Sequence, residues 1–508
     1  MAESRGKNSI KNISFGITSK VLSLLLSFAS RTVFIKLLGE ECLGLNGLFT
    51  TILSLLSLAE LGIGEAIAYY LYEPINSNNH ERLRQLVQFY KLCYRVIGAA
   101  IFGIGLLLIP ALPYLVNFET DTGYNLYLIY VLYLLNTSIT YFLFSYPQTV
   151  LNANQKQYVV TIATIIFNVV MLIGDIIVLF TTHNYIWYLV GRLVLTCVQN
   201  FVVYLYTRKK YPYISEKPAT RLSMTEIKAM FKDVYAVFVV KAASKLIDST
   251  DNLFISVFLG TVIVGYNSNY LLFITAATSL IYVAVFALGA SVGNYGVNVE
   301  KAKVEEMFRM IDVVNFIISY SFAIFLFSFC SHFISIMWGE QFVLSVLAVA
   351  LMSFNFYMTT SLYSVFMFRN ALGIFNKYKY FQLASAILNI ALDFALIKVM
   401  GIEGLFLATV ISNITLATIP FMASLYKQGF DMSAKNYILT SLARYVFVAI
   451  TGAIVYFACT WIPTTVVGFV YRVLITVGIV CAGIAVVFLI DCNLKKCIDR
   501  FKGFLVRR

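Results

Sequence analysis

The sequence has little charge and almost no histidine. Only 12% of its 508 residues are charged, and just three are histidine. His80, His183 and His332 fall far apart, and none of the eight cysteines belongs to a C-x-x-C pair. A disulfide framework, a metal centre and a histidine-based catalytic cluster are therefore not expected. No phosphate-binding P-loop is present and no loop exceeds about thirty residues, which excludes an ATPase domain.

Long apolar runs dominate the chain instead. Hydrophobic residues make up 60% of it, and the mean hydropathy is +0.82, more than a soluble domain could keep off its surface. About fourteen segments of about 17 to 28 mostly apolar residues can each cross a hydrocarbon core roughly 30 Å thick. They begin near Asn12, Leu43, Leu86, Tyr124, Tyr158, Tyr185, Asp233, Val264, Ile311, Val343, Tyr380, Glu403, Tyr437 and Phe469. We predict an all-α polytopic membrane protein with about 14 transmembrane helices.

Lys and Arg fill every second gap between these segments. The basic gaps hold Arg82 and Arg84, Lys156, Arg208 through Lys232, Lys301 and Lys303, Lys377 and Lys379, and Lys427 and Lys435. The gaps near Glu40, Glu119, His183, Thr261, Glu340, Gly401 and Thr464 hold none. Because cytoplasmic loops carry the excess of basic residues, we expect both termini in the cytoplasm. The net charge of +13 is spread over these loops, so no nucleic-acid partner is expected.

An internal repeat relates the two halves at an offset of 221 residues. The offset pairs Lys20 with Lys241, Gly39 with Gly260, Gly44 with Gly265, Asn46 with Asn267, Lys156 with Lys377 and Asn168 with Asn389. An offset of six spans is an even number of crossings, so both halves enter the membrane from the same side. The halves are therefore predicted to be parallel six-helix bundles. The predicted domains are 1–206 (N-terminal bundle), 207–232 (basic cytoplasmic linker), 233–427 (C-terminal bundle) and 428–508 (two additional helices and a basic tail). The alternative is a duplication that only stabilises a scaffold.

Ionisable groups at membrane depth are costly and therefore mark a bundle interior or a wet cavity. Polar residues on one face of the first span are Lys20, Ser23, Ser27 and Arg31. The seventh span has a matching stripe of Lys241, Ser244, Asp248 and Asn252, with Lys245 added. We predict that Arg31, Lys20, Lys241 and Lys245 line a cationic cavity that binds an anionic group. Lys20 and Lys241 have the alternative of snorkelling to the surface, and Lys245 that of pairing with Asp248.

Carboxylates inside the spans are a second set of candidates. They are Glu60, Glu65, Asp175, Asp248, Asp251 and Asp393. Burial raises a carboxyl pKa, as proton coupling requires, and several close oxygens hold a sodium ion. For each acid, hydrogen bonding between helices is the alternative. Arg192 and Arg369 are interpreted as lying close to the cytoplasmic ends of the sixth and tenth spans, outside this site.

With these residues in view, the chain resembles the Wzx-type oligosaccharide flippases, whose superfamily also contains the multidrug and toxin extrusion transporters. The similarity is strongest in SKVLSLLLSFASRTVFIKLLGEECLGLNGLFTTILSLLSLAELGIGEAIAYYL, residues 19–71, and in STDNLFISVFLGTVIVGYNSNY, residues 249–270. The resemblance implies that a polyprenyl-diphosphate-linked oligosaccharide crosses the bacterial plasma membrane for surface polysaccharide assembly, such as capsule or exopolysaccharide. Arg31, Lys20 and Lys241 are then expected to contact diphosphate or acidic sugar.

The same resemblance sets the expectations for partners and energy. Membrane lipid, a glycan polymerase and glycosyltransferases are the expected partners, no cofactor is expected, and a proton or sodium gradient is the candidate source of energy. The first alternative is a cation-coupled multidrug exporter of the same fold. The second is a membrane enzyme such as a glycan polymerase or acyltransferase, which the short outer loops disfavour.

Overall fold

The computed structural model describes residues 2–60, 63–117, 123–143, 145–154, 156–286, 300–372, 374 and 378–490. Every regular element within these ranges is helical, which confirms the all-α prediction. Eleven of the described helices are long and apolar enough to cross a membrane, or up to twelve if the bent pair Leu126–Phe142 and Tyr146–Ala153 counts as one span. The chain is therefore a polytopic membrane protein.

A break at Gly39 explains part of the difference between these helices and the fourteen predicted segments. Helix α1 (Ala2–Leu56) is continuous by hydrogen bonding, but Gly39 has φ 82° and ψ −175°. Such a positive φ is easily adopted only by glycine, so α1 is two helices joined at a kink. They contain the first predicted segment and the beginning of the second. The seventh segment lies in the 36-residue helix α9 (Met224–Leu259), which is not among the eleven.

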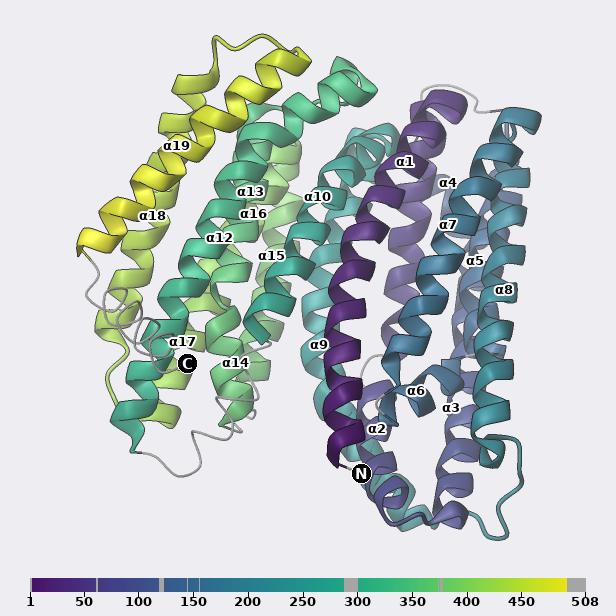
Figure 1. Ribbon diagram of the computed structural model, residues 1–508. Coiled ribbons are helices and arrows are strands. Elements are labelled where there is room, and N and C mark those ends of the chain that lie inside the picture. The colour runs from purple at the N-terminus through teal and green to yellow at the C-terminus, as the bar shows by residue number, and fades with distance from the viewer. Residues whose placement is uncertain are drawn as a thin grey trace. The chain divides into compact units, whose positions relative to one another are not determined.

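The chain divides into two compact units, Met1–Gly265 and Tyr266–Arg508. Besides α1 and α9, the first unit contains η1 (Ser57–Glu60), α2 (Ile63–Asn76), α3 (His80–Leu107), η2 (Ile109–Ala111), α4 (Leu112–Leu115), α5 (Leu126–Leu143), α6 (Ser145–Ala153), α7 (Gln157–Thr182), α8 (Tyr185–Lys210) and η3 (Pro212–Ile214). Helix α7 packs against α1 on one side and α8 on the other (Figure 1). The first unit also includes the beginning of α10 (Thr261–Phe286).

Hydrogen bonds attach the turn between α9 and α10 to the end of α4. Ser256 Oγ donates to the Leu115 carbonyl over 2.6 Å. The Thr261 amide donates to the Asn117 carbonyl over 2.9 Å, and the Asn117 amide donates back to Thr261 Oγ1 over 2.9 Å. Gly260, which the repeat pairs with Gly39, makes this turn with φ 102°. Both repeat-related glycines thus end a long helix in a conformation that favours glycine.

Gly44 and Gly265, another repeat-related pair, meet where α1 crosses the beginning of α10. A Cβ atom at Gly44 would lie 2.3 Å from the carbonyl oxygen of Thr261, and one at Gly265 would lie 2.9 Å from the amide nitrogen of Gly44. Neither backbone position tolerates such an approach. Glycine at both positions therefore allows the close helix crossing that small residues permit in membranes.

The stretch between α8 and α9, predicted as a linker, is folded against the start of α3. Ile214 is completely buried. The backbone amides of Ala219 and Thr220 donate to Glu81 Oε1 over 2.6 and 3.2 Å. Arg84 bonds Glu216 at 2.5 Å. We call residues 211–226 the strap, because these contacts fasten it to α3.

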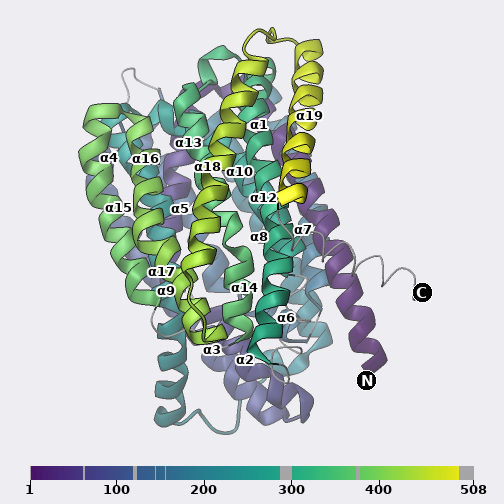
Figure 2. The same ribbon diagram turned by 90° about the vertical axis from the view of Figure 1, so that its left-hand side faces the viewer.

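The second unit contains helices on both sides of a long central helix. Its elements are the rest of α10, α12 (Lys301–Trp338), η4 (Glu340–Phe342), α13 (Val346–Ser361), α14 (Tyr363–Ala371), α15 (Tyr378–Met400), α16 (Ile402–Ser412), η5 (Asn413–Thr418), α17 (Ile419–Leu425), η6 (Tyr426–Phe430), α18 (Lys435–Cys459) and α19 (Val466–Ile490). Helices α18 and α19 pair with each other and pack on α12 (Figure 2). Elements η5 and η6 are π-helical turns within one run of helix from α16 to η6.

A buried ion pair fixes α18 to α12. Asp312 is 3% exposed and receives hydrogen bonds from Arg444 Nη1 over 2.6 Å, Tyr437 Oη over 2.9 Å and Ser364 Oγ over 2.6 Å. The guanidinium of Arg444 also lies 4.7 Å from the ring centroid of Phe316. Both oxygens of the carboxylate are satisfied, so this cluster joins α12, α14 and α18.

Candidate functional site

The hairpin of α7 and α8 brings an acid and a base together inside the first unit. Asp175 lies eight residues before His183 and Arg192 eight residues after Asn184, so the two side chains face each other at equal depth from the turn. Arg192 Nε donates to Asp175 Oδ1 over 3.2 Å, and Nη2 donates to Oδ2 over 2.8 Å. A forked, charge-assisted pair of this kind is strong and geometrically specific.

Helix α1 contributes to the same pair through Ser30. Its hydroxyl donates to Asp175 Oδ2 over 3.0 Å and accepts from Arg192 Nη2 over 3.0 Å. The Asp175 side chain is 4% exposed, whereas that of Arg192 is 37% exposed. The acid is therefore buried behind the base, and Arg192 is the member that other molecules can reach.

Arg31 lies beside this pair. Its electrostatic neighbours are Tyr188, Arg192, Tyr133 and Tyr185, and Arg31 itself is partly buried. The hydroxyls of Tyr133 and Tyr185 are hydrogen-bonded over 2.9 Å, while the guanidinium of Arg192 stands 4.7 Å from the ring centroid of Tyr188. The cluster thus places a second guanidinium beside the pair of Asp175 and Arg192.

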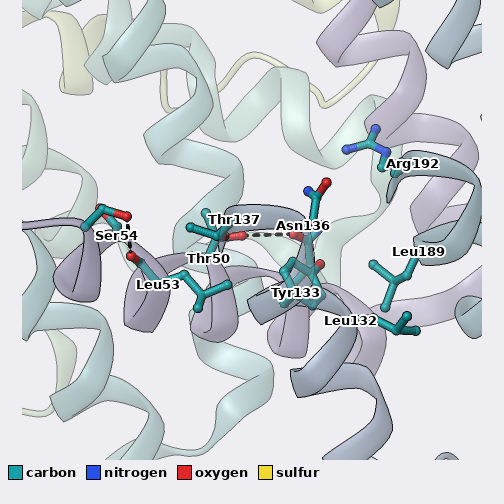
Figure 3. A pocket seen from close by; sticks show the side chains of 11 residues that line it. Thr50, Leu53, Ser54, Leu132, Tyr133, Asn136, Thr137, Leu189 and Arg192 are labelled. Carbon is teal, nitrogen blue, oxygen red and sulfur yellow. Dashed lines mark hydrogen bonds between the residues drawn. The ribbon is translucent and has the colours of Figure 1, made fainter. Parts of the chain in front are cut away.

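A cavity of about 270 Å³ adjoins these residues. Figure 3 shows Asn136 and Arg192 facing the same space. The lining residues are Asn46, Thr50, Leu53, Ser54, Ser57, Leu132, Tyr133, Asn136, Thr137, Leu189 and Arg192. The described part of its wall combines hydroxyl and amide groups with one cation and no carboxylate, which suits an anionic ligand that also carries hydroxyl groups.

The predicted basic residues do not all gather at this cavity. Arg31 adjoins it through Tyr133 and Arg192. Lys20 is exposed on α1, and Lys245 is partly buried on α9. The side chain of Lys241 lies outside the described part of the structure. Among the four predicted cavity cations, Arg31 is the one that the described side chains place next to the cavity.

Glu60, one of the predicted acids, lies next to two tyrosines. The hydroxyls of Tyr94 and Tyr141 are the electrostatic neighbours of its carboxylate. Tyr141 also lies near Ser57, which lines the cavity. The rings of Tyr94 and Tyr141 are stacked with centroids 6.4 Å apart. Glu60 is thus connected to the cavity through Tyr141 and Ser57.

The remaining acids have different surroundings. Asp251 on α9 is partly buried, and the side chains of Glu65 and Asp248 are outside the described part of the structure. Asp393 on α15 is 0% exposed. Its Oδ1 accepts from Asn389 Nδ2 over 3.2 Å, and the same amide donates to Thr409 Oγ1 over 3.3 Å. Within the described residues, Asp393 Oδ2 is buried without a hydrogen-bond partner.

The interpretation of Arg192 as a residue near the cytoplasmic end of its span was wrong. Helix α8 begins at Tyr185 and ends in the basic turn Arg208–Lys210, so Arg192 lies near the opposite end. Arg192 and Asp175 each lie eight residues from the turn at His183 and Asn184. Sequence reasoning missed this signal. Arg369 lies in the last turn of α14. Its Nη2 donates to the Ile374 carbonyl and its Nη1 to Ser424 Oγ, each over 2.8 Å.

Comparison with solved structures identifies the fold. The lipid II flippase MurJ, in an inward closed conformation, matches with a TM-score of 0.70 at 15% identity, covering 94% of this chain and all of MurJ. The chain has the fold of the MOP-superfamily transporters. A variant of the MATE transporter VcmN from Vibrio cholerae matches with a TM-score of 0.55 at 16% identity, covering 87% of this chain and all of VcmN.

A third match agrees with this fold. A MOP-superfamily transporter from Pyrococcus furiosus, described as having a binding pocket of reversed polarity, gives a TM-score of 0.54 at 12% identity, covering 83% of this chain and 96% of that one. No family model matches the chain, and no curated protein matches it. Among the described residues, no group of three or more His, Cys, Asp or Glu side chains is placed to hold a metal ion.

Proposed function

We propose that this chain flips a polyprenyl-diphosphate-linked oligosaccharide from the cytoplasmic to the outer face of a bacterial plasma membrane, by alternating access, for surface polysaccharide assembly. The observation that carries the proposal is a pair of neighbouring arginines, Arg31 and Arg192, beside a cavity lined by hydroxyl and amide groups. Arginine forks match phosphate oxygens, and hydroxyl and amide side chains match sugar hydroxyls.

In this mechanism Asp175 keeps the site intact when no substrate is bound. A lone guanidinium at membrane depth is costly, and Asp175 neutralises Arg192 in the empty state. An incoming diphosphate supplies two charges and competes with Asp175 for the exposed side of Arg192, while Arg31 provides the second cation. Lys20, Lys241 and Lys245 are proposed as further contacts to phosphate or acidic sugar.

The extent and quality of the structural matches support the flippase proposal over the drug exporter. The MurJ structure matches 94% of the chain with a TM-score of 0.70, whereas the VcmN and Pyrococcus furiosus transporters match 87% and 83% with scores near 0.55. A multidrug exporter of the same fold is the second candidate. It requires free acids for a cationic drug, but Asp175 is already committed to Arg192.

We propose Asp393 as the carboxylate that couples transport to a proton or sodium gradient. It is completely buried and accepts from the amide of Asn389, which also donates to Thr409. Its Oδ2, which has no hydrogen-bond partner among the described residues, is costly to bury as an anion unless it binds a proton or a small cation. Asp175, Glu60 and Asp251 remain further candidates, together with Glu65 and Asp248.

Transport by purified protein in liposomes tests the proposal. The probe is a fluorescent polyprenyl-diphosphate disaccharide, whose arrival at the outer face is measured by quenching with membrane-impermeant dithionite. The wild type is expected to translocate the probe. Arg31→Ala and Arg192→Ala are expected to lower the initial rate at least tenfold, because each removes a charge-assisted contact to phosphate. Arg208→Ala, an exposed arginine at the end of the same helix α8, is the matched control.

Two outcomes contradict the assignment. Wild-type rates in a correctly folded Arg31→Ala and Arg192→Ala double variant would show that the diphosphate binds elsewhere. Ethidium export without glycolipid translocation would establish the drug-exporter alternative. Asp393→Asn is expected to abolish the dependence of the rate on the ion gradient, and an unchanged gradient dependence would remove Asp393 from the coupling step.

A further inference from the structure

Arg472 is a cation inside the last predicted segment, and the transport site does not use it. It lies in α19, six residues after the helix begins at Val466, or about 9 Å along the axis. Exposed apolar side chains, Val470 and Leu474, precede and follow it by two residues. An arginine among lipid-facing residues is costly, so its presence requires compensating contacts.

The described contacts of Arg472 satisfy only part of its side chain. Nη1 donates to the Ser328 carbonyl and Nη2 to the Cys459 carbonyl, each over 2.9 Å. Cys459 is the last residue of α18, so Arg472 caps a helix end where carbonyls lack intrahelical partners. A guanidinium has five N–H donors. Nε is buried without a hydrogen-bond partner in the described part of the structure.

Among the described side chains, no carboxylate pairs with Arg472. None of the ion pairs between described residues includes it. The nearby side chains are neutral hydroxyls, Ser328 and Thr476, which are hydrogen-bonded to each other over 2.7 Å, and His332, whose Nε2 lies 3.4 Å from the Thr465 carbonyl. Arg472 is only partly buried, so an anion can approach it from the lipid side.

Aromatic residues place this region at the depth of lipid head groups. Trp461, in the turn between α18 and α19, is 72% exposed, and Tyr471, next to Arg472, is 59% exposed. Exposed tryptophan and tyrosine mark the boundary between hydrocarbon and water. The charge pattern of the loops predicts the outer side for this turn. With that topology, phosphates of outer-leaflet lipids are the anions available to Arg472.

We propose that Arg472 binds the phosphate of an anionic membrane lipid at the outer end of α18 and α19. The phosphate accepts from the remaining N–H groups of Nη1 and Nη2, and it supplies a negative charge that no described neighbour of Arg472 provides. The lipid thereby holds together α18, α19 and α12, the three helices that contribute to the site. The inference is independent of which substrate the protein transports.

Lipid-dependent thermal unfolding of the detergent-purified protein tests the proposal. Adding dioleoylphosphatidylglycerol is expected to raise the Tm of the wild type in a saturable way. Arg472→Gln keeps hydrogen-bond donors but loses the charge. Its apparent Kd for this lipid is expected to rise about tenfold or more. Lys435→Gln changes an exposed cation at the opposite end of α18 and is expected to match the wild type.

Further control ligands distinguish binding of a lipid at Arg472 from binding of a free anion. Dioleoylglycerol, which lacks phosphate, and inorganic phosphate at equal concentration are both expected to leave the Tm unchanged. A rise in Tm with inorganic phosphate alone would show a free-anion site and overturn the lipid assignment. If Arg472→Gln cannot be purified, Arg472→Lys keeps the charge but loses the fork, and it is expected to bind the lipid several-fold more weakly. Wild-type lipid affinity in Arg472→Gln or Arg472→Lys would overturn the proposal.

Discussion

Arg192 of α8 and Asp175 of α7 form a forked ion pair, with N–O distances of 3.2 and 2.8 Å, and Ser30 of α1 bonds both partners. Three helices of the first unit are therefore connected through one carboxylate. Because Asp175 is 4% exposed, the pair contributes both to stability and to keeping Arg192 in place beside the cavity.

A double-mutant cycle on this pair measures that contribution. Asp175→Asn and Arg192→Gln are each expected to destabilise the protein, because each leaves a charge without its partner. The coupling free energy between the two changes is expected to be about 2 kcal/mol. Unfolding in mixed detergent micelles followed by circular dichroism gives the four free energies. Additive effects of the two substitutions would show that the pair does not act as a unit.

The crossing of α1 and α10 predicts a strong effect of adding single methyl groups. Gly44→Ala and Gly265→Ala both place a Cβ atom within 2.9 Å of backbone atoms, so each is expected to destabilise by about 1–3 kcal/mol. Gly103→Ala in α3 meets nothing within 4 Å and is expected to be neutral or slightly stabilising. The Tm values of the three variants check this. Equal Tm values for all three would contradict the close crossing.

The attachment of α18 depends on the pair of Asp312 and Arg444. Arg444→Met leaves a buried carboxylate without its cation and is expected to cost about 3–5 kcal/mol. Adding Asp312→Asn to that variant is expected to restore part of the loss, because the unpaired charge is then gone. Lys435→Met, an exposed cation on the same helix, serves as the control. Failure of the second substitution to recover any stability would show that packing, not charge, dominates here.

The strap is expected to loosen at acidic pH. The pKa of Glu226 is lowered because the Ser223 backbone amide and hydroxyl donate to its carboxylate, with a further contribution from Arg82. Because this pKa is lowered, the stabilisation by ionised Glu226 is complete above the ordinary glutamate pKa of about 4.3. The stabilisation is lost as the pH falls through the lower pKa of the folded state.

Spin labels at Leu92 and Lys217 measure this loosening by electron–electron resonance. The distance distribution is expected to stay narrow at neutral pH and to broaden as the pH is lowered below about 4. Glu226→Gln is expected to show less pH dependence, because it removes one of the groups that titrate. A distribution that keeps its width throughout the titration in the wild type would exclude a carboxylate-dependent strap.

Some of these features were predictable from the sequence, and the reasons differ by residue. The run lengths predicted helices that span a membrane, because hydrocarbon thickness fixes the length that a helix needs. The offset of 221 residues selected Gly39 with Gly260 and Gly44 with Gly265, and the structure gives the first pair positive φ and brings the second pair into contact. Rare residues that hold one offset thus marked real backbone requirements.

Other features depended on tertiary contacts that no local pattern encodes. Asp312 and Arg444 are 132 residues apart in sequence, and nothing in either neighbourhood indicates the other. Asp175 and Arg192 are separated by 17 residues, but their pairing follows only once the turn at His183 and Asn184 is located. The strap was also missed, because its contacts with α3 join residues more than 120 positions apart in sequence.

The π-helical turns in the run from α16 to η6 determine which face of the helix the later side chains occupy. A π turn holds one more residue than an α turn, so each one rotates all later side chains by about 100° about the axis. Thr409, before η5, faces Asn389, whereas Ser424, after it, faces Arg369. Deleting a single amino acid between residues 413 and 418 would convert the stretch to ordinary helix and turn Ser424 away from its arginine.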